Sequence, residues 1–142
     1  MAQEDSKESV DARHGIFTQL NKNEAFTCGT SYANALVFSA KFIRESVFVI
    51  KNDDATIGMD YKIYGSLKND ADATTLTDDD WVNLLSIKAG HDGTTYDHDQ
   101  ASALDATKKV VETLDNPYSK IVVQIKSDSG TPTAKVWHRG EN

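Results

Sequence analysis

Histidine and aspartate side chains gather in two polar stretches, and these are the residues best suited to chemistry. The first stretch holds His91, Asp92, Asp97, His98 and Asp99. Imidazole nitrogens and carboxylate oxygens are ligands that zinc accepts, so this group is a candidate divalent-metal site. Its spacing matches no established metal motif, and residues on a loop need tertiary support to fix ligand geometry. We therefore expect a solvated polar loop over residues 91–99, with metal binding as the alternative.

The second stretch, residues 70–80, is acidic. Its aspartates are Asp70, Asp72, Asp78, Asp79 and Asp80. Calcium favours clustered oxygen ligands, but this stretch lacks the alternating Asp/Asn ladder, the central glycine and the terminal glutamate of an EF-hand. We expect an acidic surface loop that faces a basic patch on a partner. Calcium binding is the alternative.

The single cysteine and the lack of known catalytic motifs argue against an enzyme. Cys28 is the only cysteine, so the chain cannot form an internal disulfide, and it lacks the paired spacing of a zinc site. The usual fate of such a cysteine is burial. The sequence has no Ser-His-Asp elbow, glycine-rich phosphate loop or HExxH motif. Its acids lie in predicted loops, without the apolar surroundings that raise a catalytic pKa. We expect no enzymatic activity and no cofactor.

Aromatic side chains offer binding surface instead. The candidate set is Tyr61, Tyr64, Trp81, Tyr96, Tyr118 and Trp137. If Tyr64 and Trp137 point outward from their strands, they form an exposed aromatic surface of the kind used in carbohydrate-binding modules and protein interfaces. The competing interpretation places most of the set in the core or at strand edges. Tyr64 and Trp137 are the candidate contact residues from the body of the domain.

The composition fits one acidic domain. The chain has 142 residues and a net charge of −7, and a globule of this length buries about 68–70% of its unfolded surface. The negative charge disfavours a nucleic-acid partner, because phosphate neutralisation needs clustered Lys and Arg. No apolar run approaches the roughly 18 residues of a membrane helix, and the first residues lack the apolar segment of a signal peptide. We expect a soluble protein made in a cytoplasm.

The first part of the chain differs from the rest. Residues 1–24 carry charges of both signs and few apolar side chains, so alone they cannot bury enough surface to offset their chain entropy. They are predicted to form an extended N-terminal arm, with residues 25–142 as the folded domain. A short apolar patch in the arm, formed by Ile16, Phe17 and Leu20, is a candidate contact with its own domain or with a neighbouring subunit.

The domain shows the pattern of short β-strands. Residues 46–51, SVFVIK, are almost continuously apolar, which suggests a strand covered on both faces. Residues 60–67 alternate, with Tyr61 and Ile63 placed inward. Residues 121–126 and 133–137 are predicted to form a hairpin around a Ser-Asp-Ser-Gly turn. Seven or eight such antiparallel strands indicate an all-β fold, a β-sandwich or jelly-roll-like barrel.

Residues 101–114 are ambiguous. Their apolar positions partly fit a helical period, and their composition is compatible with a helix. The context favours a strand, because residues 108–113 can pair as one and Asn116-Pro117 is a stop signal. We expect a loop or a single helical turn that leads into a strand from about Thr107.

The order of these segments resembles a pattern in small structural proteins of tailed bacteriophages and related viruses. In that pattern a segment of the type Y-x-V-Y-G-S-x-D-G-x-x-W precedes a final strand of the type Y-x-Y-V-R-V-Q-V-K. The matching residues are Tyr61, Ile63, Tyr64, Gly65, Ser66 and Trp81, then Tyr118, Ile121, Val122, Val123, Gln124, Ile125 and Lys126. The match covers roughly residues 46–137. The loop before Trp81 is longer here, and Val122 replaces a basic Arg.

The resemblance implies a virion structural protein, assembled in the host cytoplasm. Its most specific form is a head-decoration or minor capsid protein that binds the shell lattice, often as a trimer. The partners would be the major capsid protein and neighbouring copies of the chain. Contact would run through the N-terminal arm and through loops or a sheet edge, with avidity across the lattice. The alternatives are a tail-associated virion protein and a carbohydrate-binding module that uses the exposed aromatic residues.

Overall fold

The structure is a computed structural model, and it describes residues 5–11, 16–88, 95–115 and 117–142; for residues 5–11, 16 and 88 it describes the backbone only. The described elements are almost entirely strands. In chain order they are β1 (Asp5–Asp11), β2 (Ile16–Thr27), β3 (Ala33–Ser39), β4 (Glu45–Asn52), β5 (Met59–Ser66), β6 (Val82–Asn83), α1 (Leu84–Lys88), β7 (Ser102–Leu104), β8 (Lys109–Asp115), β9 (Lys120–Ser127) and β10 (Thr133–Glu141).

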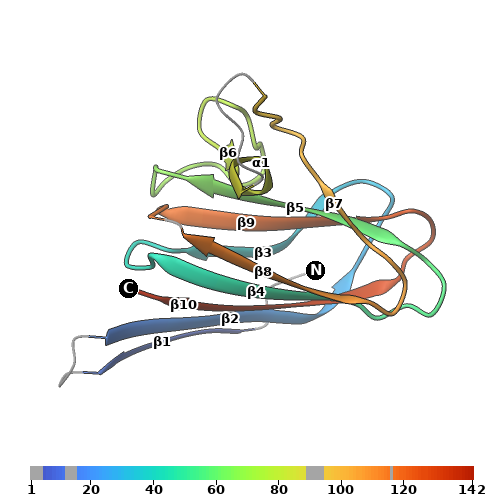
Figure 1. Ribbon diagram of the computed structural model, residues 1–142, viewed down its shortest axis with the longest axis horizontal. Coiled ribbons are helices and arrows are strands. Elements are labelled where there is room, and N and C mark those ends of the chain that lie inside the picture. The colour runs from blue at the N-terminus through green and yellow to red at the C-terminus, as the bar shows by residue number, and fades with distance from the viewer. Residues whose placement is uncertain (1–4, 12–15, 89–94, 116) are drawn as a thin grey trace.

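The strands form two antiparallel sheets (Figure 1). The first sheet has the order β1-β2-β10-β4-β8. The second has the order β3-β9-β5-β6, and β7 also pairs with β5. Without β1 and β6, the order is β2-β10-β4-β8 against β3-β9-β5-β7, and every connection except β5 to β7 crosses between the sheets. This is the eight-stranded jelly roll. The expected all-β, sandwich or jelly-roll class is therefore confirmed.

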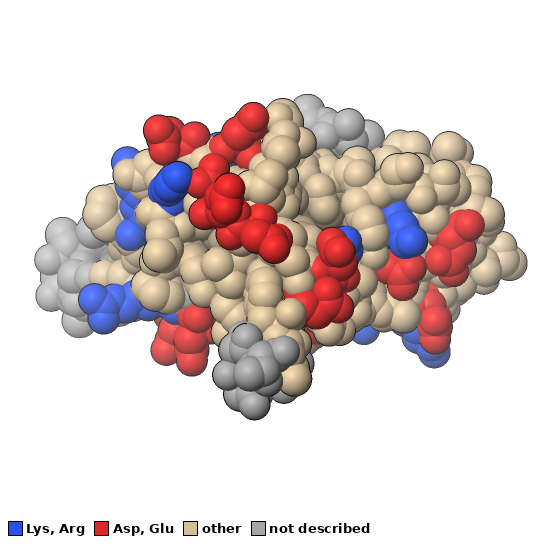
Figure 2. Space-filling view, turned by 90° about the horizontal axis from the view of Figure 1, so that it is seen from above, with Lys and Arg blue, Asp and Glu red and all other residues tan. Residues whose placement is uncertain are grey.

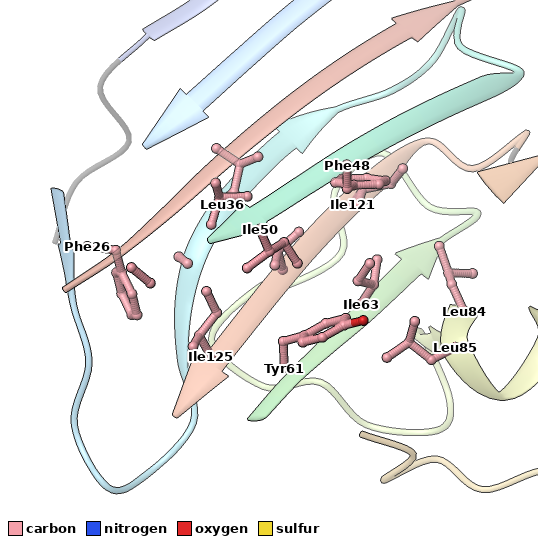
Figure 3. Packing of buried hydrophobic residues seen from close by; sticks show 14 of the residues in the cluster. Phe26, Leu36, Phe48, Ile50, Tyr61, Ile63, Leu84, Leu85, Ile121 and Ile125 are labelled. Carbon is pink, nitrogen blue, oxygen red and sulfur yellow. The ribbon is translucent and has the colours of Figure 1, made fainter. Parts of the chain in front are cut away.

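The main core lies between the two sheets (Figure 3). Because side chains alternate along a strand, β4 sends Phe48 and Ile50 inward, both fully buried. They meet inward side chains of the second sheet, among them Tyr61, Ile63 and Ile125. Each large apolar side chain buried in this way contributes about 1.5–3 kcal/mol. The inward placement of Tyr61 and Ile63 agrees with the prediction.

A polar contact crosses this core. The Tyr61 hydroxyl donates to a carboxylate oxygen of Glu112 on β8 at 2.7 Å. Burial, and next the hydrogen bond to Glu112, raise the pKa of Tyr61 well above its usual value of 10.0. The phenol therefore stays neutral and remains a donor. This bond ties β5 of the second sheet to β8 of the first.

Replacing this donor is our first prediction. The variant Tyr61→Phe removes one hydrogen bond to a charged group, so the free energy of unfolding is expected to fall by about 1.5–3 kcal/mol. Urea unfolding followed by circular dichroism measures the change. Tyr118→Phe is the control, because its half-buried ring also packs against the main core, and its hydroxyl makes no hydrogen bond within the described residues. An unchanged stability of Tyr61→Phe would contradict the proposed tie between the sheets.

A second, smaller core covers the outer face of the second sheet. Trp81, Tyr64, Ala71 and Val122 are its buried members. The indole nitrogen of Trp81 donates to the carbonyl of Asp72 at 3.2 Å, which fixes the acidic loop above the ring. In Figure 1 the connection from β5 to β7, with β6 and α1, lies over this side of the molecule. The chain thus covers one of its two outer sheet faces itself.

Two predictions about individual strands are wrong, one about pairing and one about burial. Residues 121–126 and 133–137 lie in β9 and β10, which belong to different sheets, so their connection is a crossover and not a hairpin. The turn itself is present, with Gly130 at a φ of 63°. Residues 46–51 form most of β4, but this strand is covered only on its inner face, and Val47 on its outer face is 41% exposed.

The boundary expected at residue 24 falls inside β2. Residues 16–24 belong to this twelve-residue strand, which pairs with β10 along its length. The backbone of β1 pairs in turn with β2, from Asp5 opposite Lys22 to Asp11 opposite Ile16. The described part of the expected arm is therefore the edge of the first sheet. The sequence did not predict β2 because the inward side chains of this strand, Gln19, Asn21 and Asn23, are polar.

The ambiguous stretch 101–114 forms two strands, β7 and β8, around a turn. The turn contains Thr107, whose φ is 66°. Residues 102–104, expected in a loop or a helical turn, instead form the short strand β7, whereas the strand expected after them is confirmed as β8. The strand begins at Lys109, two residues after the expected position.

Candidate interaction surface

The outer face of the first sheet has no covering layer among the described residues, and its centre is largely apolar, with Lys22, Arg139 and Thr113 among the apolar side chains. The strand register places the outward side chains of β2, β10, β4 and β8 in rows that run across the sheet. One central row is Lys22, Trp137, Val49 and Val111. The next is Leu20, Arg139, Val47 and Thr113. We call these two rows the apolar band.

The apolar band is exposed and hollowed. Val111 is 57% exposed, and Leu20 and Val47 are also among the exposed large apolar side chains. An open hollow of about 470 Å³ lies over β2, β10 and β4, with Trp137 and Arg139 in its lining. A contiguous exposed apolar area that includes a tryptophan and an arginine has the composition of a protein interface.

Charged rows of opposite sign flank the band. Toward one end of the strands lie Lys135, Lys51 and Lys109 in register. Toward the other end lie Glu141, Glu45 and Asp115. We call these the basic row and the acidic row. In the first, Lys51 and Lys135 contact Asp53 at 3.3 and 3.7 Å. Glu141 of the acidic row pairs with Arg139 at 3.0 Å, and Lys22 of the apolar band pairs with Glu24 at 3.0 Å. These pairs are solvent-accessible, so each contributes about 0–1 kcal/mol and can rearrange when a partner binds.

The predicted contact residues divide between this surface and the interior. Leu20 and Trp137 lie together on the outer face of the first sheet and line the hollow. Phe17 packs against the main core, with its ring 5.6 Å from that of Phe42. Because side chains alternate along β2, Phe17 and Leu20 point to opposite faces and do not form one patch. The side chain of Ile16 lies outside the described part of the structure.

Tyr64 does not belong to any exposed surface. It points away from the main core as expected, but the β5–β7 connection covers it, and it is 3% exposed. Its hydroxyl donates to the carbonyl of His98 at 2.7 Å. Burial raises the pKa of Tyr64 to about 12. Tyr64 is therefore wrong as a contact residue, because its ring forms part of the second core.

The candidate metal ligands of the 91–99 stretch are only partly described, since His91 and Asp92 lie outside the described residues. His98 is held by protein atoms: Nε2 donates to the carbonyl of Leu76 at 2.8 Å, and Nδ1 lies 2.7 Å from the Tyr96 hydroxyl and 3.1 Å from a carboxylate oxygen of Asp78. A metal would have to displace one of these bonds. No group of three or more possible ligand side chains is found within the described residues.

The acidic stretch 70–80 is a surface loop anchored to the fold. Asp72 accepts hydrogen bonds from the backbone and hydroxyl of Thr74, which lower the pKa of its carboxyl. Asp80 pairs with Lys68. Figure 2 looks onto the side that carries β6 and α1 and shows more red Asp and Glu than blue Lys and Arg there. The expected acidic surface is present.

Sequence reasoning missed the outward valines. Val47 and Val49 were placed in a strand covered on both faces, and Val111 in the ambiguous stretch. The signal was present in both runs, because VFVI and KVV put apolar residues on each side of a strand. What the sequence did not reveal is that nothing in the described chain covers the outer side.

Two further features bear on how the chain can be attached. Cys28 is 1% exposed, and burial raises the pKa of its thiol to about 11. As the expected burial is confirmed, this thiol is not available to another molecule in the folded state. Among the described residues, no helix has the length and apolar character to cross a membrane.

Comparison with known proteins finds a shared fold and no family. No protein-family model matches the sequence, and no curated protein matches it. A solved chain from the Bacillus endospore appendages, which form disulfide-linked pili, is similar over 89% of this chain and 85% of that chain, with a TM-score of 0.52 and 10% identity. This likeness shows the fold alone.

Two more solved chains are more distant. The SPBc2 prophage-derived protein YomS has a TM-score of 0.44 and 17% identity over 87% of this chain and 95% of that chain. A chain of infectious bursal disease virus, Gx strain, has a TM-score of 0.45 and 9% identity over 98% of this chain and 32% of that chain. At these scores neither likeness carries an argument, and the decoration family that the sequence resembles is not identified by them.

Proposed function

We propose that the chain is a virion structural protein of the capsid-decoration type, which attaches to a shell lattice and to neighbouring copies of itself. The observation that carries the proposal is the apolar band on an otherwise uncovered sheet face. Jelly rolls are a recurrent architecture of viral capsid domains. An exposed apolar face of this kind marks a contact surface rather than a solvated one.

The chemistry of the described side chains supports an assembly role over catalysis. Cys28 is buried with a raised thiol pKa. His138 is buried and packs against the Phe38 and Phe48 rings, with centroids 4.2 and 4.8 Å away. His98 is held by Leu76 and Tyr96. Each of these groups is engaged in the fold, whereas a catalytic group needs access to substrate.

Other surfaces suit the same role. The strand β1 is at the edge of the first sheet, and an edge strand offers backbone groups that can pair with another chain. This edge replaces the free arm as the second candidate contact with the shell. The acidic side seen in Figure 2 is suited to face solvent, because net charge opposes aggregation.

A pilus subunit is the competing assembly function, because the endospore appendage chain shares the fold. Those pili are disulfide-linked. Cys28, the single cysteine of this chain, is buried, so the folded protein cannot be linked through it in the same way. A disulfide at Cys28 therefore does not link folded copies of this domain.

A test on particles addresses the proposal directly. Particles are purified by density gradient from the host that encodes the chain, and the chain is quantified by mass spectrometry and immunogold labelling. We expect it in the particle fraction at a fixed ratio to the major shell protein. A chain found only in the soluble fraction, with particles of normal composition, would overturn the proposed function.

A single substitution extends this test and is our second prediction. The variant Val111→Asp places a charge in the apolar band at a side chain that is 57% exposed, so the fold should tolerate it. Its occupancy on particles is expected to fall about tenfold or more, since burying an unpaired charge is costly. The matched control is Leu67→Asp, an exposed side chain outside this face. Equal occupancy for both variants would remove the apolar band from the attachment.

A further inference from the structure

We infer that the outer face of the first sheet binds the same face of a second copy of this chain, around a two-fold axis that lies in the interface and runs across the strands. The inference rests on the proposed function, because it names the partner of the same surface. It is carried by the order of the rows along the strands: basic row, two apolar rows, acidic row.

This order is self-complementary in only one of two arrangements. A two-fold axis along the strands would place the basic row of one copy over the basic row of the other, which costs energy through repulsion. An axis across the strands reverses the strand direction of the partner. Each basic row then faces an acidic row, and the two apolar rows face each other. Such an isologous contact makes every pairing twice.

The same axis keeps each strand opposite its own counterpart. On β4, Lys51 of one copy faces the partner's Glu45, and Val49 faces the partner's Val47. On β10, Trp137 faces the partner's Arg139, so a guanidinium meets an indole ring in a cation–π contact. Aromatic and arginine side chains at the centre of a contact are the types that contribute most to binding.

The size of the surface is sufficient for a dimer. Four strands about 4.8 Å apart and four rows about 6.8 Å apart give about 500 Å² per copy, or about 1,000 Å² for the pair. Specific interfaces begin at about this size. Two sheets also pack face to face in a regular way, about 10 Å apart and within about 30° of alignment.

Sedimentation of the purified full chain tests the inference. We expect a monomer–dimer equilibrium, and a dilution-dependent change in the emission of Trp137, since Trp81 is already buried in each copy. Val111→Asp should raise the dissociation constant about tenfold or more, while Leu67→Asp should leave it unchanged. Circular dichroism confirms that each variant is folded. A wild-type chain that is monomeric up to about millimolar concentration would overturn the inference.

A pair of charge variants tests the axis, and this is our third prediction. Lys51→Glu with Lys109→Glu makes two of the three side chains of the basic row acidic and leaves Lys135. Glu45→Lys with Asp115→Lys makes two of the three side chains of the acidic row basic and leaves Glu141. Each variant alone should dimerise about tenfold or more weakly, and their mixture should form the heterodimer with near wild-type affinity. If mixing does not restore association, the arrangement of the rows is wrong.

The two hypotheses fail in different ways. If the chain stays monomeric in solution but Val111→Asp still loses its place on particles, the apolar band binds the shell, and only the dimer is overturned. If the chain dimerises and the charge variants behave as expected but no particle contains it, the dimer stands and the virion role is overturned.

Discussion

Acidification below about pH 6.5 is expected to destabilise the protein through His138 alone, at first by about 1 kcal/mol per pH unit and below about pH 5 by about 1.4 kcal/mol per unit. Burial lowers the pKa of this imidazole from 6.5 to about 3. Between these two values the unfolded chain binds a proton that the folded chain does not, so stability falls as the pH falls. The loss approaches about 5 kcal/mol at pH 3, a large part of the stability of a typical domain.

The surroundings of His138 explain why it stays neutral. Nδ1 lies 3.0 Å from the amide nitrogen of Asn21, which can only donate, so Nδ1 accepts. Nε2 therefore carries the proton and donates to the Ser46 hydroxyl at 2.9 Å. Protonation would place two donors against each other at Asn21. The rings of Phe38 and Phe48 exclude water from the remaining sides.

The measurement is urea unfolding at several pH values between about 6.5 and 5, a window that lies above the usual carboxylate pKa values. The variant His138→Gln keeps a polar side chain but cannot be protonated in this range. Between about pH 6.5 and 5 its stability should depend less on pH than that of the wild-type chain, by about 1 kcal/mol per unit. Equal slopes for the two proteins would show that His138 is protonated in the folded state.

The fold class could be predicted because strand signals are local. Alternation in residues 60–67 and the apolar run in 46–51 depend only on neighbouring side chains, and both correspond to strands. Pairing is a long-range property. A turn such as the one at Gly130 can connect two strands of one sheet or two strands of different sheets, so the sequence did not distinguish a hairpin from a crossover.

The site was predictable only in part, for the same reason. The structure places two of the candidate contact residues, Leu20 and Trp137, on an exposed face, and their role as contacts stays a prediction. That they lie together depends on β2 pairing with β10, across more than 110 residues of chain. Tyr64 was misjudged because the β5–β7 connection around Trp81 covers it, and the sequence does not reveal where that connection lies on the sheet.

Because Trp81 anchors the β5–β7 connection, its substitution is expected to destabilise the fold more than substitution of Trp137. Trp81→Ala is expected to lower the free energy of unfolding by about 3–5 kcal/mol, because a fully buried indole leaves a large cavity. It also removes the donor to the Asp72 carbonyl. The ring separates the acidic loop from Tyr64 and Val122, so its loss should expose the outer face of the second sheet and make residues 67–83 sensitive to protease before the sandwich unfolds.

Trp137→Ala is the matched control, with the same atoms removed from a half-buried ring on the opposite outer face. Its cost to the monomer should be smaller, about 1–2 kcal/mol, because less apolar surface returns to water. Its cost to dimerisation should be larger than that of Trp81→Ala, because Trp137 lies in the apolar band. Urea unfolding by circular dichroism and sedimentation separate the two effects. Equal losses of stability in both variants would mean that the β5–β7 connection does not depend on Trp81 for its place on the sheet.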